Sequence, residues 1–455
     1  MKRLIETIKN INKIEELRKR ILYTLGIILI YRIGSYIVLP GVDPNMLSAL
    51  HKQTSGGILS LLNMFSGGAF SNASIFALGI MPYISASIVV QLFGMVIPYF
   101  QKLQKEGESG RKKINQITRF LTVLILLFQS PGYIANIISQ LPAEAIYPFD
   151  INATHSILSF FGISSILILT AGSLFVMWLG EKITDKGIGN GISLLIMVGI
   201  IARLPFAFVA EFVARMEETG GGGLVVFLVE IVFLILVILL CILLVQGTRK
   251  IPVQYAKRIV GNKQYGGVRQ YIPLKVNAAG VMPIIFAQAI MFIPITLVGF
   301  AHSESLSGFV AVFSDFNGFW YNFAFAIMII AFTYFYTAVT MNTNQMAEDM
   351  KKNGGFIPGV KPGKKTADFL DSIMSKITFP GSVFLAIVAI MPAIARMFGV
   401  NSQFAQFYGG TSLLILVGVI LDTLQQIESH LLMRHYEGLT KSGRIKGRTA
   451  MPMSA

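Results

Sequence analysis

The chain has 455 residues, of which 54% are apolar and only 13% charged, and its formal net charge is +15. An ordinary soluble domain carries about 25% charged residues, so this composition excludes a soluble globular protein. Apolar runs recur along the whole chain, and the run 224–245 holds a single charge, Glu230. Since about 20 apolar residues cross a membrane, the sequence predicts a polytopic integral membrane protein.

We expect an all-α membrane fold of ten transmembrane helices. The first run is interpreted as a retained helix and not a signal peptide, because it is long, contains Arg32 and precedes no small-residue cleavage site. The expected spans are 21–40, 73–98, 120–139, 155–179, 192–214, 224–246, 276–300, 320–341, 379–398 and 410–432.

The ten spans divide into two halves of five, 21–214 and 215–432. Since five is odd, consecutive halves enter the membrane with opposite orientation, which is the geometry of an inverted repeat. Residues 1–20 alternate isoleucines with lysines, which predicts an amphipathic helix that lies either on the membrane surface or on the protein itself. Residues 433–455 form a C-terminal tail.

Basic residues are divided unequally between the two sides of the membrane. Only Lys52 and Arg215 fall in the loops of one side, so the positive-inside rule places both termini and the other loops in the cytoplasm. The net charge therefore needs no nucleic-acid explanation. Two of the cytoplasmic loops, 247–275 and 342–378, far exceed the roughly 2 to 8 residues of an ordinary helix connection. Their exposed lysines and arginines suit an acidic partner surface or ribosomal RNA.

A short apolar stretch, Ile58 to Ser66, has glycines on both sides. Nine helical residues rise only about 14 Å, so this stretch cannot span a membrane. It is either an interfacial helix on the outer surface or a flexible segment that closes a channel, and glycine hinges favour the second interpretation.

Polar and small residues interrupt several of the expected spans, among them Ser87, Gln91, Gln129, Asn277 and Gln288. They either pack helices together or face water. The deepest charges are Arg32, Glu230 and Asp422, which are too scattered for the proton or ion relay of a coupled transporter.

Catalytic chemistry has little support in the sequence. The single cysteine, Cys241, lies in an apolar run, and the five histidines lack metal-ligand spacing. The nucleotide-binding pattern GxxxxGK[ST] does not occur. We therefore expect no metal, no cofactor and no enzymatic activity.

Several motifs, in order along nearly the whole chain, resemble the SecY family, the channel subunit of the bacterial Sec protein translocase. They are NMFSGGAFS (63–71), ASIFALGIMPYISASIVVQ (73–91), KEGESGRKK (105–113), LGEKITDKGIGNGIS (179–193), YAKR (255–258), PLKVN (273–277), GVKPG (359–363) and YGGTSLLI (408–415).

The resemblance implies a channel whose two five-helix halves enclose a central pore for unfolded polypeptides. A ring of aliphatic side chains seals the pore, and the matching residues are Ile80, Ile84, Ile192, Ile196, Ile285 and Ile415. A plug helix at 57–66 closes the outer side, with the positions Gly57, Ile58, Leu59, Leu61, Leu62, Met64 and Phe65.

The resemblance also implies a lateral gate between the second and seventh spans, through which signal sequences and nascent membrane helices enter lipid. Its candidate residues are Ser87, Gln91, Gln129, Asn277 and Gln288. Candidate docking residues on the long loops are Arg258, Lys263 and Lys361. Lys361 stands where the family typically has arginine, so the docking contact lacks the planar donor fork of a guanidinium.

The implied partners are the SecE and SecG subunits, the SecA motor ATPase, the ribosome with its RNA, nascent chains, SecDF, YidC and lipid. The implied location is the bacterial cytoplasmic (inner) membrane. A secondary transporter with inverted repeats is the alternative, and hydropathy alone would favour it; a membrane enzyme is third.

Overall fold

A computed structural model describes residues 14–47, 50, 63–141, 145–146, 159–217, 223–255, 258–260, 263–265, 269–288, 290–291 and 318–442. Helices dominate it. The long ones are α2 (Glu15–Gly34), α5 (Met81–Val96), α7 (Glu108–Gln140), α9 (Phe160–Lys186), α10 (Gly191–Glu217), α11 (Gly223–Gln246), α14 (Phe319–Thr340), α16 (Lys364–Met397) and α18 (Gly410–Ser442). The short ones are η1 (Pro44–Met46), α6 (Pro98–Lys105), α15 (Thr343–Lys352), α17 (Ser402–Ala405) and η4 (Gln406–Tyr408).

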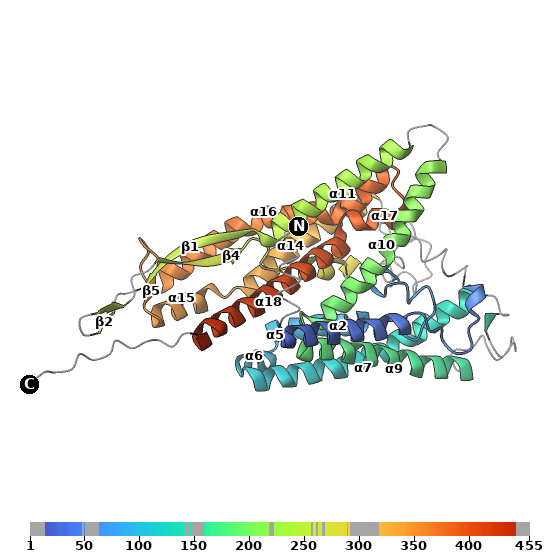
Figure 1. Cartoon of the computed structure of the whole chain (residues 1–455), viewed down its shortest axis with the longest axis horizontal. Helices are drawn as coiled ribbons and strands as arrows, with labels where there is room; N and C mark the ends of the chain where they lie inside the picture. Colours follow the sequence, from blue (N-terminus) through green and yellow to red (C-terminus); the bar gives the residue numbers. More distant parts are fainter. Residues whose placement is uncertain are drawn as a thin grey trace, which may run out of the picture.

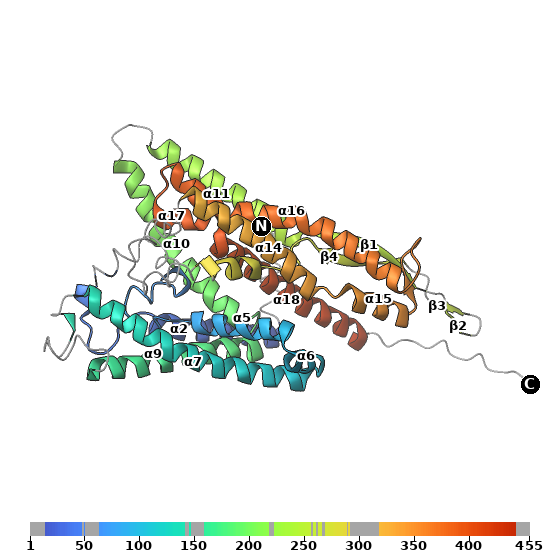
Figure 2. The same ribbon diagram turned by 180° about the vertical axis from the view of Figure 1, so that it is seen from behind.

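The helices form two bundles that follow the chain order. Helices α2, α5, α6, α7 and α9 make one bundle, and α11, α14, α16 and α18 make the other (Figures 1 and 2). Helix α10 runs obliquely between the bundles and packs against α9 on one side and α18 on the other. The division into two halves at 214/215 stays a prediction, since α10, the last helix of the expected first half, contacts both bundles.

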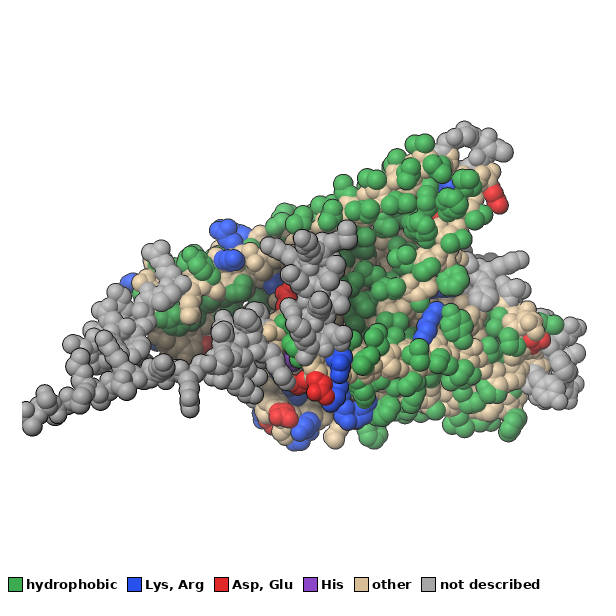
Figure 3. Space-filling view, viewed as in Figure 1, with side chains coloured by type: hydrophobic (Ala, Val, Ile, Leu, Met, Phe, Trp, Pro, Cys, Tyr) green, Lys and Arg blue, Asp and Glu red, His purple; other side chains and the backbone are tan. Residues whose placement is uncertain are grey.

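Membrane-spanning character is clear for most of the long helices. Seven helical segments of the described chain are long and apolar enough to cross a membrane: α7, α9, α10, α11, the run Phe319–Lys352 that contains α14, α16, and α18 up to Leu431. Apolar side chains cover much of the outer surface (Figure 3), and Leu243 on α11 is 68% exposed. Lipid, rather than water, suits such a surface, so the chain is a multi-pass membrane protein.

Three of the ten expected spans, the first, the second and the seventh, fall outside this set. Helix α2 begins at Glu15, with Arg18, Lys19 and Arg20 before the predicted span, and ends at Gly34, so its apolar part is shorter than the predicted 21–40. The seventh span is described only as far as residue 291. The count of ten therefore stays a prediction.

The second span begins later than predicted. Residues 66–80 form turns, and the helix α5 covers only Met81–Val96 of the predicted 73–98. Positive φ angles at Ala73 (44°) and Gly79 (53°), both within the predicted span, are incompatible with an α-helix. A bend of 101° then separates α5 from α6 at Pro98, and the two helices together make an eighth candidate span.

The two long loops are largely ordered, which the sequence did not predict. In the first loop, β1 (Thr248–Tyr255) pairs antiparallel with β4 (Arg269–Lys275). The second loop adds β5 (Gly355–Phe356) to the other edge of β1, and α16 starts at Lys364, well before the predicted 379. A small second hairpin joins β2 (Arg258–Val260) to β3 (Lys263–Tyr265). The two loops therefore share one sheet.

A small apolar core explains why these loops fold. Ile251 and Val253 alternate with exposed residues along β1, as expected for a strand with one buried face. They pack with Leu274 of β4 and with Leu370 and Met374 of α16. The beginning of α16 thus covers one face of the sheet, and this part of the helix is amphipathic instead of membrane-spanning.

The turn between α9 and α10 accounts for the glycine-rich motif 187–191. Gly189 has a φ of 81°, and its N–H donates to Oε1 of Gln426 on α18 at 2.9 Å. A Cβ on Gly191 would lie 1.9 Å from the carbonyl oxygen of Gly180, so only glycine allows the two helices to approach this closely. The motif therefore joins α9, α10 and α18 at one point.

Candidate functional site

Five of the six predicted ring isoleucines pack in one apolar cluster, which we name the central cluster. Ile80, Ile196 and Ile415 are buried in it, and Ile84 and Ile192 pack against them from positions that are partly buried. They come from α5 and the residue before it, from α10 and from α18. The cluster therefore lies where the first bundle, the crossing helix and the second bundle meet.

A cavity of about 430 Å³ lies on one side of the central cluster, and we name it the isoleucine cavity. Ile285 lines it together with Ile84, Ile192, Ile196 and Ile415, so all six ring positions adjoin one another or this space. Further apolar side chains, among them Val245 and Val281, line much of the rest of its wall, and polar side chains line one part of it: Tyr83, Ser87, Gln91, Asn190, Ser193, Lys275, Asn277 and Asp422.

Helical spacing explains how the cavity wall is built. On α5, Ile84, Ser87 and Gln91 follow one another at intervals of three and four residues, which places them on one face of the helix. The same spacing puts Ile415 and Asp422 on one face of α18. Each helix thus presents isoleucine toward the cluster and a polar group farther along the cavity.

Three of the five predicted gate residues line this cavity, namely Ser87, Gln91 and Asn277. Among the described residues, Oε1 of Gln91 and Oδ1 of Asn277 are buried without a hydrogen-bond partner. Buried polar atoms normally find partners, so this wall is suited to water or to the backbone of a peptide. Gln129 is exposed on α7 and Gln288 is buried elsewhere, and neither belongs to the cavity wall.

A second cavity of about 260 Å³, the arginine cavity, lies on the other side of the central cluster. Its wall includes Arg32, Arg203, Asn72 and Gln403. Along α10, the isoleucine cavity ends at Ile196 and the arginine cavity begins at Ala202, six residues or about 9 Å farther along the helix. The two cavities share no wall residue, so an apolar partition separates two spaces that each have polar side chains in part of their wall.

The described end of the predicted plug forms part of this partition. Met64 is 2% exposed in the central cluster and Phe65 packs against it, while Met64 also lines the arginine cavity. Gly57, Ile58, Leu59, Leu61 and Leu62 lie outside the described residues.

Hydrogen bonds to the backbone hold the chain that follows Phe65. Nη1 of Arg32 donates to the carbonyl oxygen of Gly67 at 2.7 Å. The hydroxyl of Tyr133 donates to the carbonyl oxygen of Phe70 at 2.7 Å. A Cβ on Gly67 would lie 2.8 Å from Cα of Gly199 on α10. The end of the plug segment is therefore fixed to α2, α7 and α10, and sequence reasoning identified none of these anchors.

The predicted docking residues lie on the shared sheet region. Arg258 and Lys263 are in the β2–β3 hairpin, and exposed Lys361 is in the turn between β5 and α16. Since β5 pairs with β1, the structure connects both long loops, although the side chains of Arg258 and Lys263 lie outside its description.

A family model for SecY matches residues 74–424. The chain is 43% identical over 439 residues to the protein translocase subunit SecY of Mycobacterium bovis, covering 94% of this chain and 97% of that one. It is 44% identical over 444 residues to the same subunit of Streptomyces scabiei, with coverage of 94% and 98%. The chain belongs to the SecY family.

Solved structures with the same fold have lower sequence identity. One, described as "The structure of a protein conducting channel", has a TM-score of 0.58 at 18% identity and covers 94% of this chain and 95% of its own. Another, Sec61 in the canine ribosome–channel complex, has a TM-score of 0.56 at 16% identity, with coverage of 94% and 95%. The predicted family and the all-α membrane fold are both confirmed.

One charged residue of this SecY-family chain was misplaced by the sequence reasoning. Arg215 was assigned to an exposed loop, but it lies inside α10 and is 7% exposed. It forms an ion pair with Glu230, which the sequence had identified as an intramembrane charge. Pairing explains how both can be buried.

Replacing Ile196 with asparagine is expected to hydrate the partition, since an apolar neck excludes water and ions only while its side chains cannot bind them. If the polar group lowers the barrier by about 1.4 kcal/mol, ion flux rises about tenfold. Ion leak through proteoliposomes measures the effect. Ile196→Leu serves as the control because it keeps the position apolar. Equal leak in the two variants would contradict the sealing role.

Proposed function

We propose that this chain is the channel-forming subunit of a protein translocase, which conducts unfolded secretory polypeptides across a membrane and releases membrane-protein helices sideways into lipid. The observation that carries this function is the apolar partition between two cavities, in a chain 43% identical to proteins named protein translocase subunit SecY. A passage with a narrow apolar waist suits a substrate that must pass while ions must not.

The six isoleucines act as a pore ring, and the segment 57–66 acts as the plug. Isoleucine side chains bind neither ions nor water, and each can move aside without breaking a hydrogen bond. The contacts of Met64 and Phe65 with the central cluster support the plug assignment. Opening then requires that these two residues leave the cluster while Gly67 stays held by Arg32.

The lateral gate lies between α5 and the segment 276–288. Gln91 and Asn277, one on each element, bring unpaired buried oxygens to the same cavity. An unsatisfied buried polar group costs about 1–3 kcal/mol, so the closed gate is only marginally stable. A signal sequence or nascent helix that admits water at this interface removes the cost.

The channel works without catalysis of its own. No GxxxxGK[ST] motif occurs in the sequence, so energy comes from a motor partner or from peptide synthesis. A secondary transporter is disfavoured, because the floor of the isoleucine cavity offers apolar side chains and its charges, Lys275 and Asp422, do not form a dense polar site near the partition.

The partners and the orientation follow from the same assignment. The chain lies in the bacterial inner membrane with both termini in the cytoplasm and associates with SecE and SecG. The sheet region presents Arg258, Lys263 and Lys361 to SecA or to the ribosome; a Sec61 structure with this fold is described in a ribosome–channel complex. SecDF and YidC are further partners of the family.

Depletion of the protein in its host is expected to make unprocessed precursors of secreted proteins accumulate. The accumulation should begin as cell growth dilutes the remaining channel. Pulse labelling followed by precipitation of a secreted protein measures this. Re-expression from a plasmid should restore processing. Normal export together with the loss of a single solute's uptake would instead identify a transporter.

Replacing Gln91 or Asn277 with leucine is expected to stabilise the closed gate, because each change removes a buried oxygen that has no partner. Removing about 1–3 kcal/mol of cost lowers the opening equilibrium about 5- to 150-fold. Export of a precursor with a weakened signal sequence should slow accordingly. Gln116→Leu, an exposed change on α7, controls for added hydrophobicity. Unchanged dependence on the signal sequence would remove both residues from the gate.

Reversing the charge at Lys361 with Glu is expected to weaken docking of the motor, since an acidic partner surface is then repelled instead of attracted. Motor-driven translocation into vesicles should fall several-fold and lose part of its salt dependence. Lys376→Glu reverses an exposed charge on α16 outside the turn and serves as the comparison. Identical kinetics for both variants would place Lys361 outside the docking surface.

A further inference from the structure

Helices α10 and α11 meet in a V whose apex joins the two halves of the chain (Figure 1). The backbones touch near the apex: a Cβ on Gly223, the first residue of α11, would lie 1.9 Å from the carbonyl oxygen of Arg215. Phe208 and Phe212 of α10 stack edge-on against Phe227 of α11, with ring centroids 5.1 and 5.4 Å apart. The apex is therefore a tightly packed joint.

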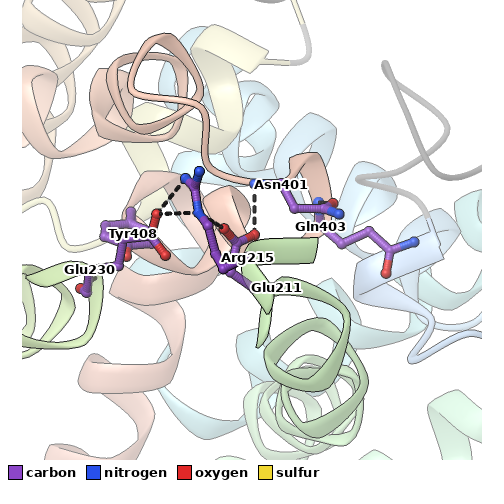
Figure 4. A network of polar contacts seen from close by, with 6 residues as sticks. All are labelled: Glu211, Arg215, Glu230, Asn401, Gln403 and Tyr408. Carbon is purple, nitrogen blue, oxygen red and sulfur yellow. Dashed lines mark hydrogen bonds and ion pairs between the residues drawn. The ribbon is translucent and has the colours of Figure 1, made fainter. Parts of the chain in front are cut away.

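A buried ionic network crosses this joint (Figure 4). Nε of Arg215 lies 3.1 Å from Oε1 of Glu211, one turn earlier on α10. Nη2 of Arg215 lies 2.6 Å from Oε1 of Glu230 on α11. Two backbone contacts extend the network into the second half: the N–H of Asn401 donates to Oε2 of Glu211 at 2.8 Å, and the hydroxyl of Tyr408 donates to the carbonyl oxygen of Glu230 at 2.9 Å.

Because these charged groups are buried, their bonds add little to the free energy of unfolding. They mainly fix the relative orientation of α10 and α11. Glu211 is 1% exposed, and Arg215 and Glu230 are each 7% exposed. Desolvation of buried charges offsets most of their attraction, so apolar residues of similar size often replace such a network without loss of stability. Oε2 of Glu230 has no hydrogen-bond partner in the described part of the chain. A network selected for stability alone would not leave this buried oxygen without a partner.

The joint lies far from the isoleucine cavity, but α10 and α11 both extend from the joint to the wall of this cavity. Ile192, near the start of α10, and Val245, near the end of α11, line that cavity. From Glu230 to Val245 the helix α11 extends about 22 Å. A change of about 10° in the angle between the helices would therefore move Val245 about 4 Å relative to α10.

We propose that Glu211, Arg215 and Glu230 form an ionic pivot that sets the angle between the two halves and thereby the resting width of the isoleucine cavity. They are positioning residues, because they line neither the isoleucine cavity nor the arginine cavity. The channel role of that cavity rests on the proposed function, but the pivot itself is a statement about the angle between the bundles and can be measured without translocation.

The test measures the distance between the bundles directly. Spin labels replace two exposed lysines, Lys112 on α7 and Lys376 on α16, in the full-length chain with Cys241→Ala, reconstituted in lipid nanodiscs. Pulsed electron paramagnetic resonance gives the distance distribution, and thermal unfolding is recorded for each sample. The parent protein should give one narrow distribution.

Arg215→Met leaves two buried carboxylates without a cation and endangers folding, so a triple variant decides the question. Glu211→Gln, Arg215→Met and Glu230→Leu together remove every charge and keep an acceptor for Asn401. This variant should fold, yet its distance distribution should shift or broaden by about 4 Å, the displacement that a 10° change produces at the end of α11. Arg119→Met removes the only cation of the Arg119–Glu181 pair, which lies within the first bundle, and should leave the distribution unchanged.

Two results would overturn the pivot. If the triple variant folds and gives the parent distribution, then packing alone sets the angle. If the triple variant fails to fold, the network is required for stability and is not a positioning device. Neither result bears on the precursor accumulation that tests the channel function.

Discussion

The contact of isoleucines from three elements with Met64 is the interaction on which the rest of this structure depends. Ile80, Ile196 and Ile415 bury their side chains together, between two cavities that both have polar side chains in part of their walls. An aliphatic contact can separate two such spaces and still part without leaving an unpaired donor or acceptor. Hydrogen-bonded groups in the same place would seal less well and would open at a higher cost. The turns, anchors and crossing helix around the partition can be understood as means of bringing these side chains to one point.

The segment after the plug illustrates this dependence. The chain between residues 66 and 80 makes turns that a continuous membrane helix would not allow, and its carbonyl oxygens are taken up by Arg32 and Tyr133. Backbone bonds of this kind fix a segment whatever its side chains do. Met64 and Phe65 can therefore leave or rejoin the partition while their attachment point stays where it is, close against Gly199.

Features of the fold and of the site could be predicted where their sequence signal lies within a short stretch of the chain. Hydropathy located most of the long helices, since its signal belongs to short stretches of sequence. The motif resemblance predicted six ring isoleucines, of which five pack in the central cluster and Ile285 lines the isoleucine cavity. The late start of α5 was missed because its cause, positive φ at Ala73 and Gly79, is hidden within an apolar stretch. The sheet was missed because β1 and β5 are a hundred residues apart along the chain and alternate too briefly to stand out. Arg215 was misplaced because its partner Glu230 lies 15 residues farther along the chain, in the other half, and pairing across such a distance leaves no local pattern.

Helix α10 unites these features, since one helix contributes to the turn at Gly189, the isoleucine cavity, the partition and the ionic network. Its two ends are held differently. At the start, neutral hydrogen bonds hold it: the N–H of Gly191 donates to Oγ1 of Thr184 on α9, and the N–H of Gly189 donates to Gln426 of α18. Near the end, three charged groups and two aromatic contacts join it to α11. Apolar packing alone resists separation there but allows sliding, whereas bonds from one guanidinium to two carboxylates have preferred directions. The ionic network is therefore the part of the joint that can define an angle, and the partition, which lies along the same helix, responds to that angle.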